Sequence, residues 1–181
     1  MELMVVLVIL GLAAGLVLPR FAEARARAAL KAGARDVITM LGYARAQATA
    51  EGRSYRVQVD PSSGEFSTSC FDPEQDPDEP YAPHAGILGE TLTLPTGVSF
   101  ARVAVGEDAG GVQAPGTPAR TSSTGETYVQ FCPDGTVDQA LIVIANEDGD
   151  ELNLVLDQFT GRARVLEPEE AQELRSDLGL E

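Results

Sequence analysis

The hydrophobic pattern of this chain changes its period twice. Residues 3–18 form an unbroken apolar run, LMVVLVILGLAAGLVL, and the single carboxylate of Glu2 directly precedes it. Across residues 21–52 the apolar positions recur at steps of three and four, which is the period of a helix with one buried face. After Gly52, apolar and polar residues alternate with period two, as they do in strands. The pattern therefore predicts an α+β fold, with one long N-terminal helix packed on an antiparallel β-sheet or β-sandwich.

The apolar run predicts the part of the helix that lies in a membrane or in a filament core, residues 1–20. As a helix this run would span about 24 Å, a little less than the roughly 30 Å hydrocarbon core of a bilayer. A secretory signal peptide is the alternative, but it requires a break after the run, and here helical sequence continues. An ionised carboxylate beside such a helix is costly to bury alone, so Glu2 indicates an assembly that supplies a partner.

The second half of the helix, residues 21–52, is amphipathic. Pro19 removes a backbone donor and crowds the preceding turn, so we expect a kink just before this half. Gly33 and Gly42 favour close packing or bending, and Gly52 is expected to end the helix. The buried face is expected to consist of Phe21, Leu30, Ala34, Val37, Ile38, Leu41, Ala44 or Arg45, and Ala48.

A β domain is expected over residues 53–167, followed by an acidic tail over residues 168–181. The last four expected strands are joined by the turn-forming sequences PDGT, EDGD and QFTG, so they should form an antiparallel meander. The charged, proline-broken residues 72–86 fit neither a strand nor a helix. The expected strands are residues 54–60, 65–71, 91–94, 98–105, 127–132, 140–146, 151–157 and 162–166.

Charge is divided unevenly along the chain. Residues 1–56 carry 8 basic and 4 acidic side chains, whereas residues 57–181 carry 5 and 24, which gives net charges of +4 and −19. A domain this acidic repels phosphate backbones, which disfavours nucleic acid as its main partner. Proteins or cations are the partners that this charge favours.

Cysteine chemistry is limited to two residues. Cys70 and Cys132 lie too far apart in the sequence for a metal motif such as C-x-x-C. In an oxidising compartment they would close a loop of about 60 residues and stabilise the fold by about 4 kcal/mol, and two buried free thiols are the equal alternative. No carboxylate pair, catalytic triad or phosphate-binding loop is recognisable, so the sequence predicts neither an enzyme nor a cofactor.

Two acidic clusters are candidate Ca²⁺ sites, because hard cations prefer clustered carboxylates. Neither has the register of an EF-hand, so the favoured interpretation is a solvated loop for the first and a hairpin turn for the second. The first contains Asp72, Asp76 and Asp78 with Glu74 and Glu79, and the second contains Asp148, Asp150 and Glu151.

Two segments carry a resemblance to a known family. The segment ELMVVLVILGLAAGLVLPRF resembles the N-terminal region of type IV pilins and type II secretion pseudopilins. The segment YVQFCPDGTVDQALIVIANEDGDELNLVLDQFTGRARV is similar to the C-terminal half of the GspH/FimT family of minor pseudopilins, in which an F-x-P-D-G strand-turn leads to a terminal T-G-R hairpin. The resemblance implies a pilin-like fold. It also implies that Glu2 neutralises the terminal amine of an adjoining subunit and that Pro19 bends the helix.

The function that the resemblance implies is that of a minor pseudopilin of the type II secretion system. Such a subunit is anchored in the bacterial inner membrane by a single span, with its globular domain in the periplasm, until it joins the tip or initiation complex of the pseudopilus. Its partners would be other minor and major pseudopilins, the secretin or a secreted substrate. Four basic residues follow the span, Arg20, Arg25, Arg27 and Lys31, and the positive-inside rule alone would instead keep the domain in the cytoplasm.

Two other functions stay open. A FimT-like minor pilin of a type IV pilus, which in some systems binds DNA during uptake, would need a basic patch on its C-terminal hairpins, where this chain offers only Arg162 and Arg164. An unrelated membrane-tethered β domain, such as a Ca²⁺-dependent binding module, would instead use the acidic clusters.

Overall fold

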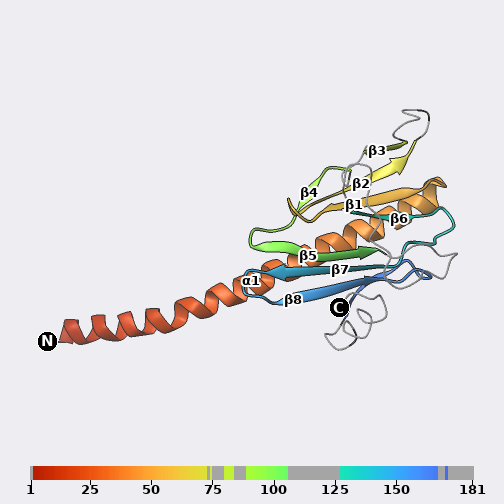
Figure 1. Cartoon of the computed structure of the whole chain (residues 1–181). Helices are drawn as coiled ribbons and strands as arrows, with labels where there is room; N and C mark the ends of the chain where they lie inside the picture. Colours follow the sequence, from red (N-terminus) through yellow and green to blue (C-terminus); the bar gives the residue numbers. More distant parts are fainter. Residues whose placement is uncertain are drawn as a thin grey trace.

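One long helix and nine strands form the described part of the chain (Figure 1). The computed structural model describes residues 2–72, 74, 80–83, 89–105, 127–166 and 170, and within residues 1–22 it describes the side chains of Met4 and Val6 alone. The elements are α1 (Glu2–Glu51), β1 (Tyr55–Asp60), β2 (Glu65–Phe71), β3 (Tyr81–Pro83), β4 (Leu92–Thr93), β5 (Val98–Val105), β6 (Thr127–Phe131), β7 (Ala140–Asn146), β8 (Glu151–Leu156) and β9 (Ala163–Leu166).

The strands form two antiparallel sheets. In the first sheet the order is β3-β2-β1-β6, and β4 also pairs with β2. In the second sheet the order is β5-β7-β8-β9. The period-two pattern therefore correctly predicted that this part of the chain forms antiparallel strands. The predicted α+β fold of one N-terminal helix on antiparallel sheets is confirmed.

The prediction of a four-strand meander was wrong for its first strand. β6 pairs with β1 in the first sheet, so that only β7, β8 and β9 form a meander. After β6 the chain reverses through an isolated bridge between Phe131 and Val137 before it enters the second sheet. Asp138 Oδ2 supports this crossing by accepting a hydrogen bond at 3.0 Å from the backbone N–H of Gln130. The PDGT sequence makes a real turn, but the turn leads from one sheet to the other.

The short strand β3 was not expected, because it falls inside residues 72–86. Tyr81 lies opposite Phe71 on β2, and their rings meet edge to face with centroids 5.4 Å apart. β3 is the edge of the first sheet, where a proline such as Pro83 is tolerated because the outer side of an edge strand pairs with no neighbour.

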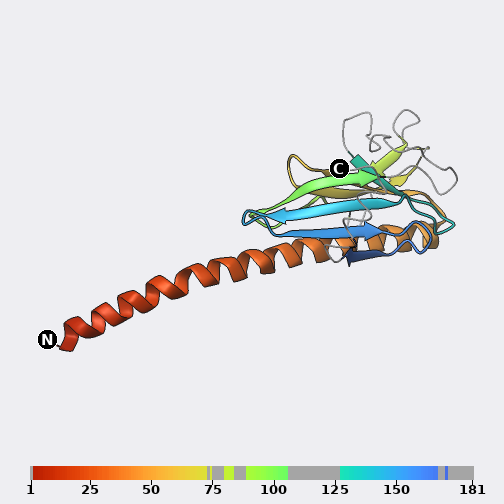
Figure 2. The same cartoon turned by 60° about the horizontal axis from the view of Figure 1, so that its bottom comes forward.

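The second half of α1 packs along both sheets (Figure 2). Met40 also belongs to the buried face, although the expected face did not include it. Ile38 packs at the margin of the core, and the side chain of Phe21 lies outside the described residues. The expected residues that are at most 3 % exposed are Leu30, Ala34, Val37, Leu41, Ala44 and Ala48.

The helix ends at Glu51, and Gly52 follows with a φ of 65°, as the sequence predicted. The buried ring of Tyr55, at the start of β1, reaches back to this end of the helix. Its hydroxyl donates a hydrogen bond of 2.8 Å to Glu51 Oε2. The turn between α1 and β1 is therefore closed by a side-chain bond as well as by the backbone.

β7 is buried on both faces, which explains its nearly continuous apolar sequence ALIVIAN. Ile142 and Ile144 belong to the core that includes the buried face of α1. Leu141 and Val143 belong to a separate cluster with Val155. Because successive side chains of a strand point to opposite faces, these two clusters lie on opposite faces of the second sheet.

Candidate functional site

The first half of α1 extends away from the β domain (Figures 1 and 2). The two side chains described there, Met4 and Val6, are 76 % and 53 % exposed. Among the described side chains of the helix, Ala29 is partly buried against the β domain and Leu30 is the first that is fully buried. Since apolar surface is unfavourable in water, the exposed side chains of Met4 and Val6 favour contact with another apolar surface.

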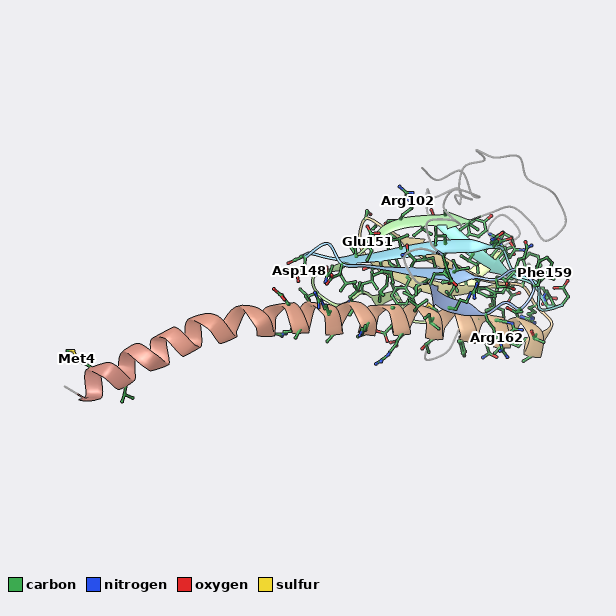
Figure 3. The ribbon with its side chains drawn as sticks, turned by 90° about the horizontal axis from the view of Figure 1, so that it is seen from below. Met4, Arg102, Asp148, Glu151, Phe159 and Arg162 are labelled. Carbon is green, nitrogen blue, oxygen red and sulfur yellow. The ribbon has the colours of Figure 1, made fainter. Side chains whose placement is uncertain are left out.

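Glu2 and Pro19 both lie on this half of α1. The backbone is helical from Glu2 through Pro19 without a break, and the helix axis curves along the projecting half (Figure 3). Both side chains lie outside the described residues, so the charge partner of Glu2 and the bend at Pro19 stay predictions. Most side chains of the apolar run, residues 3–18, also lie outside the described set.

Across the residues that the structure describes, no helix is both long enough and apolar enough to cross a bilayer.

An ion pair joins α1 to the β domain near the point where the projecting half begins. Arg27 Nε donates a hydrogen bond of 3.1 Å to Asp150 Oδ2, at the start of β8. Asn146 Nδ2 donates to the same oxygen at 3.2 Å, and Asn146 Oδ1 accepts from the backbone N–H of Asp150 at 2.8 Å. Hydrogen bonds from Asn146, and to a smaller extent from Arg27, lower the pKa of Asp150. The β7–β8 turn is thereby held against the helix.

Two glycines let backbone segments approach α1 closely. A Cβ on Gly33 would lie 3.1 Å from Leu94 Cδ2 and 3.2 Å from Pro95 Cδ, so this glycine allows the segment after β4 to pack on the helix. At the other end of the domain, Gly161 lies directly against the side chain of Arg45. Gly42 faces open space and has no such role. The expectation of close packing is therefore confirmed for Gly33 alone.

An arginine held between two tyrosines lies on the outer face of the first sheet. The guanidinium carbon of Arg56, on β1, is 3.4 Å from the ring centroid of Tyr81 on β3 and 4.3 Å from that of Tyr128 on β6. Gln130 Oε1 accepts hydrogen bonds of 3.3 Å from both Nε and Nη2 of Arg56. The sequence did not single out this group. Alternation along β1 shows that Arg56 points outward, but only the sheet order reveals its partners.

Cys70 and Cys132 are both free thiols and half-buried in the structure. Cys70 lies opposite Tyr55 on β1, and Tyr55 lies opposite Phe131, the residue before Cys132. Because β1 lies between β2 and β6, two strand spacings, or about 10 Å, separate the strands that carry the two cysteines. A disulfide needs Cα atoms within about 7 Å of each other. Burial raises the pKa of the Cys70 thiol. The structure holds the free-thiol alternative of the two that the sequence left open, and forming the disulfide would require the end of β6 to move toward β2.

The acidic clusters are described only in part. Asp76 and Asp78 lie outside the described residues, as does Glu79. Asp72 Oδ1 accepts a hydrogen bond of 3.3 Å from the backbone N–H of Glu74, and its Oδ2 is 4.0 Å from Arg53 Nη1. In the second cluster the carboxylate of Asp150 is already bonded to Asn146 and Arg27. Across the described positions, no three His, Cys, Asp or Glu side chains gather where they could hold a metal ion.

Comparison with known proteins gives structural neighbours and no sequence relatives. No family model matches the chain, and no curated protein matches it either. Two structures of the minor pseudopilin EpsH from the type 2 secretion system of Vibrio cholerae are similar to it. The first matches with a TM-score of 0.52 and 15% sequence identity, and the match covers 76% of this chain and 96% of that one. The second matches with a TM-score of 0.55 and 14% sequence identity, and the match covers 77% of this chain and 94% of that one. The type IV minor pilin FimU of Pseudomonas aeruginosa matches with a TM-score of 0.46 at 17% identity over 80% of this chain and 92% of that one.

The likeness to EpsH shows the fold. The chain shares with EpsH an α+β fold of one N-terminal helix on antiparallel sheets, which is the fold that the resemblance of its two segments implied.

Proposed function

We propose that this chain is a minor pseudopilin of the type II secretion system, which assembles through α1 into the periplasmic pseudopilus. The observation that carries the proposal is the division of α1 into two halves. From Leu30 onward the helix is part of the core of the β domain, whereas the half that precedes Arg27 projects beyond the domain, with Met4 and Val6 exposed. A helix that extends beyond its own domain can join the helices of other subunits. The fold shared with EpsH supports the same role.

The role is mechanical rather than catalytic. Before assembly the apolar half of α1 lies in the inner membrane, where the carboxylate of Glu2 has no cationic partner. In the pseudopilus the same half packs among the helices of neighbouring subunits, which cover its apolar surface and offer Glu2 a positive charge. Pairing removes much of the cost of holding a carboxylate in an apolar environment, so it favours the assembled state.

The β domain would lie in the periplasm and would face other minor and major pseudopilins, the secretin or a secreted substrate. The net charge of −19 over residues 57–181 supports protein partners over nucleic acid.

A minor pilin of a type IV pilus is the second candidate. The observation on its side is that Arg162 and Arg164, the two basic side chains of the hairpin of β8 and β9, are both exposed and could contact DNA, although they fall short of a full basic patch. An identity of 14–15% to EpsH shows the fold alone, so it does not decide between the two systems.

Copurification from membranes tests the proposal. The full-length chain, expressed with the pseudopilins encoded near its gene and extracted in detergent, should be recovered with at least one minor pseudopilin. Fluorescence anisotropy with double-stranded DNA should show no binding. DNA binding that is lost in Arg162→Gln and Arg164→Gln would overturn the proposal in favour of the type IV pilus. Failure to associate with any pilin-like subunit would overturn it in favour of a membrane-tethered binding module.

A further inference from the structure

Phe159, in the turn between β8 and β9, is 81 % exposed, more than any other large apolar side chain that the structure describes. Single exposed apolar side chains are common on protein surfaces, so exposure alone does not mark a site. The rigidity of this turn and the charges around it are what set Phe159 apart.

The turn that carries Phe159 is held in one conformation by Asp157. Asp157 Oδ1 accepts hydrogen bonds from the backbone N–H groups of Phe159 at 3.1 Å and Thr160 at 2.7 Å, and from Thr160 Oγ1 at 2.9 Å. The backbone N–H of Gly161 donates to the carbonyl oxygen of Asp157 at 2.7 Å. A side chain presented by such an ordered turn loses little backbone entropy when it binds a partner.

The turn also rests on α1. Gly161 lies against the side chain of Arg45, so the helix supports the turn from below. Phe159 lies at the end of the molecule opposite Met4 (Figure 3). Packing of the projecting half of α1 among other helices would therefore leave Phe159 uncovered.

The charges around Phe159 differ from those of the rest of the domain. Residues 57–181 carry only 5 basic side chains, and two of them, Arg162 and Arg164, follow Phe159 on the same hairpin and are exposed. Arg45 contributes a third positive charge from the helix.

Two carboxylates lie near these arginines: Asp157, which carries its negative charge in the same turn, and Asp134, whose neighbour Gly135 approaches Gly161. The three arginines outnumber these two carboxylates. This end of an acidic domain therefore favours a partner surface that bears carboxylates.

We propose that Phe159 anchors a docking site for a second pilin-like subunit, whose surface offers an apolar pocket bordered by carboxylates. The ring of Phe159 fills the pocket, and Arg162 pairs with the carboxylates at its edge. Aromatic and arginine side chains are the residues that most often dominate the energy of protein interfaces. This inference rests on the proposed function, because it takes the partner to be a subunit of the same filament.

Photo-crosslinking tests the docking site in the full-length chain. p-Benzoylphenylalanine is placed at position 159 in membranes that contain the coexpressed pseudopilins. Phe71, an aromatic residue of the first sheet that is 37 % exposed, gives a matched control position. Irradiation should join position 159, and not position 71, to one pilin-like subunit. In a binding titration with that subunit, Phe159→Ala should weaken the affinity at least tenfold and Phe71→Ala less than threefold.

The outcomes separate this inference from the proposed function. If the wild-type chain joins no pilin-like subunit, the proposed function itself fails. If it does join one, and Phe159→Ala binds as tightly as wild type without a crosslink from position 159, the docking site alone is refuted. A crosslink from position 159 to DNA would also refute it. Because Phe159 is exposed, its alanine variant should unfold at the same temperature as wild type, which confirms that any loss of binding is local.

Discussion

Arg45, on the helix, lies directly beneath Gly161, in the T-G-R sequence of the last hairpin. A Cβ atom at position 161 would be 2.6 Å from Arg45 Nε and 2.8 Å from its Cδ. Gly161 also has a φ of 60°, in the left-handed region that other residues rarely adopt. Backbone conformation and close packing therefore both require glycine where the second sheet meets α1.

Gly161→Ala should destabilise the protein by about 2 kcal/mol, because it adds left-handed strain of about 1 kcal/mol and also displaces Arg45. The free energy of unfolding in urea measures this effect. Gly149→Ala is the control, since Gly149 has a φ of 87° and its Cβ would meet nothing within 4 Å. Combining Gly161→Ala with Arg45→Ala should recover the part of the steric loss that is due to Arg45, while the contact of the new methyl group with the carbonyl oxygen of Gly135, at 3.3 Å, remains. Equal losses for the variants at 161 and 149 would show that contact with Arg45 is unimportant.

Two glycines of α1 should respond differently to alanine. Gly42 faces open space, so Gly42→Ala should stabilise the protein by about 0.5–1 kcal/mol through helix propensity alone. Gly33→Ala brings a methyl group to within 3.1 Å of Leu94 and 3.2 Å of Pro95, so it should gain less than Gly42→Ala. Thermal and urea unfolding of the two variants give the comparison. An equal gain at both positions would mean that the segment after β4 is not closely packed.

Arg56→Lys should destabilise the protein by about 1 kcal/mol. Lysine keeps the positive charge, but it loses the planar contact with Tyr81 and Tyr128 and the paired hydrogen bonds to Gln130. Gln58→Ala, on the same face of β1, should change stability by less than about 0.5 kcal/mol. The free energies of unfolding of the two variants are measured in urea. If Arg56→Lys loses no more stability than Gln58→Ala, the stacked guanidinium adds no stability.

Acid should weaken the turns that are held by carboxylates. Hydrogen bonds from Ser62 and Ser63 lower the pKa of Asp60 to about 2, and hydrogen bonds from Thr160 and Phe159 lower the pKa of Asp157. A carboxylate whose pKa is lower in the folded state stabilises the fold above its unfolded pKa of about 3.9. That contribution is lost as the pH falls through the folded pKa, here between about pH 4 and pH 2 for Asp60. Urea midpoints should therefore fall over this window, and less steeply in Asp60→Asn. An identical pH profile for that variant would remove Asp60 from the explanation.

Glu2→Ala should leave the subunit in the membrane and impair its incorporation into the pseudopilus, because the variant lacks the charge that a neighbouring subunit would neutralise. Glu2→Gln keeps the size of the side chain but removes its charge, so it should show the same defect. Glu2→Asp keeps the charge and should retain part of the incorporation into the pseudopilus. Crosslinking within isolated pseudopili measures incorporation, and membrane fractionation checks the location of each variant. Normal incorporation of Glu2→Gln would rule out a role for the charge.

Local sequence determined the kind of each main element. A three- and four-residue period places Leu30, Val37 and Leu41 on one helix face whatever that face meets, and Gly52 ends the helix through its own backbone freedom. Alternation likewise predicted the longer strands and their turns. These features depend on neighbours a few residues apart, so they can be read along the chain.

Only the tertiary structure decided which distant segments meet. β6 has the same alternating pattern whether it pairs with β1 or with β7, so its place in the first sheet could not be read from residues 127–131. The stacking of Arg56 between Tyr81 and Tyr128 depends on that sheet order, as does the separation of Cys70 from Cys132. Strand pairing and helix packing join residues far apart in the sequence through many weak contacts at once. The alternating pattern of one strand does not specify which other strand it pairs with.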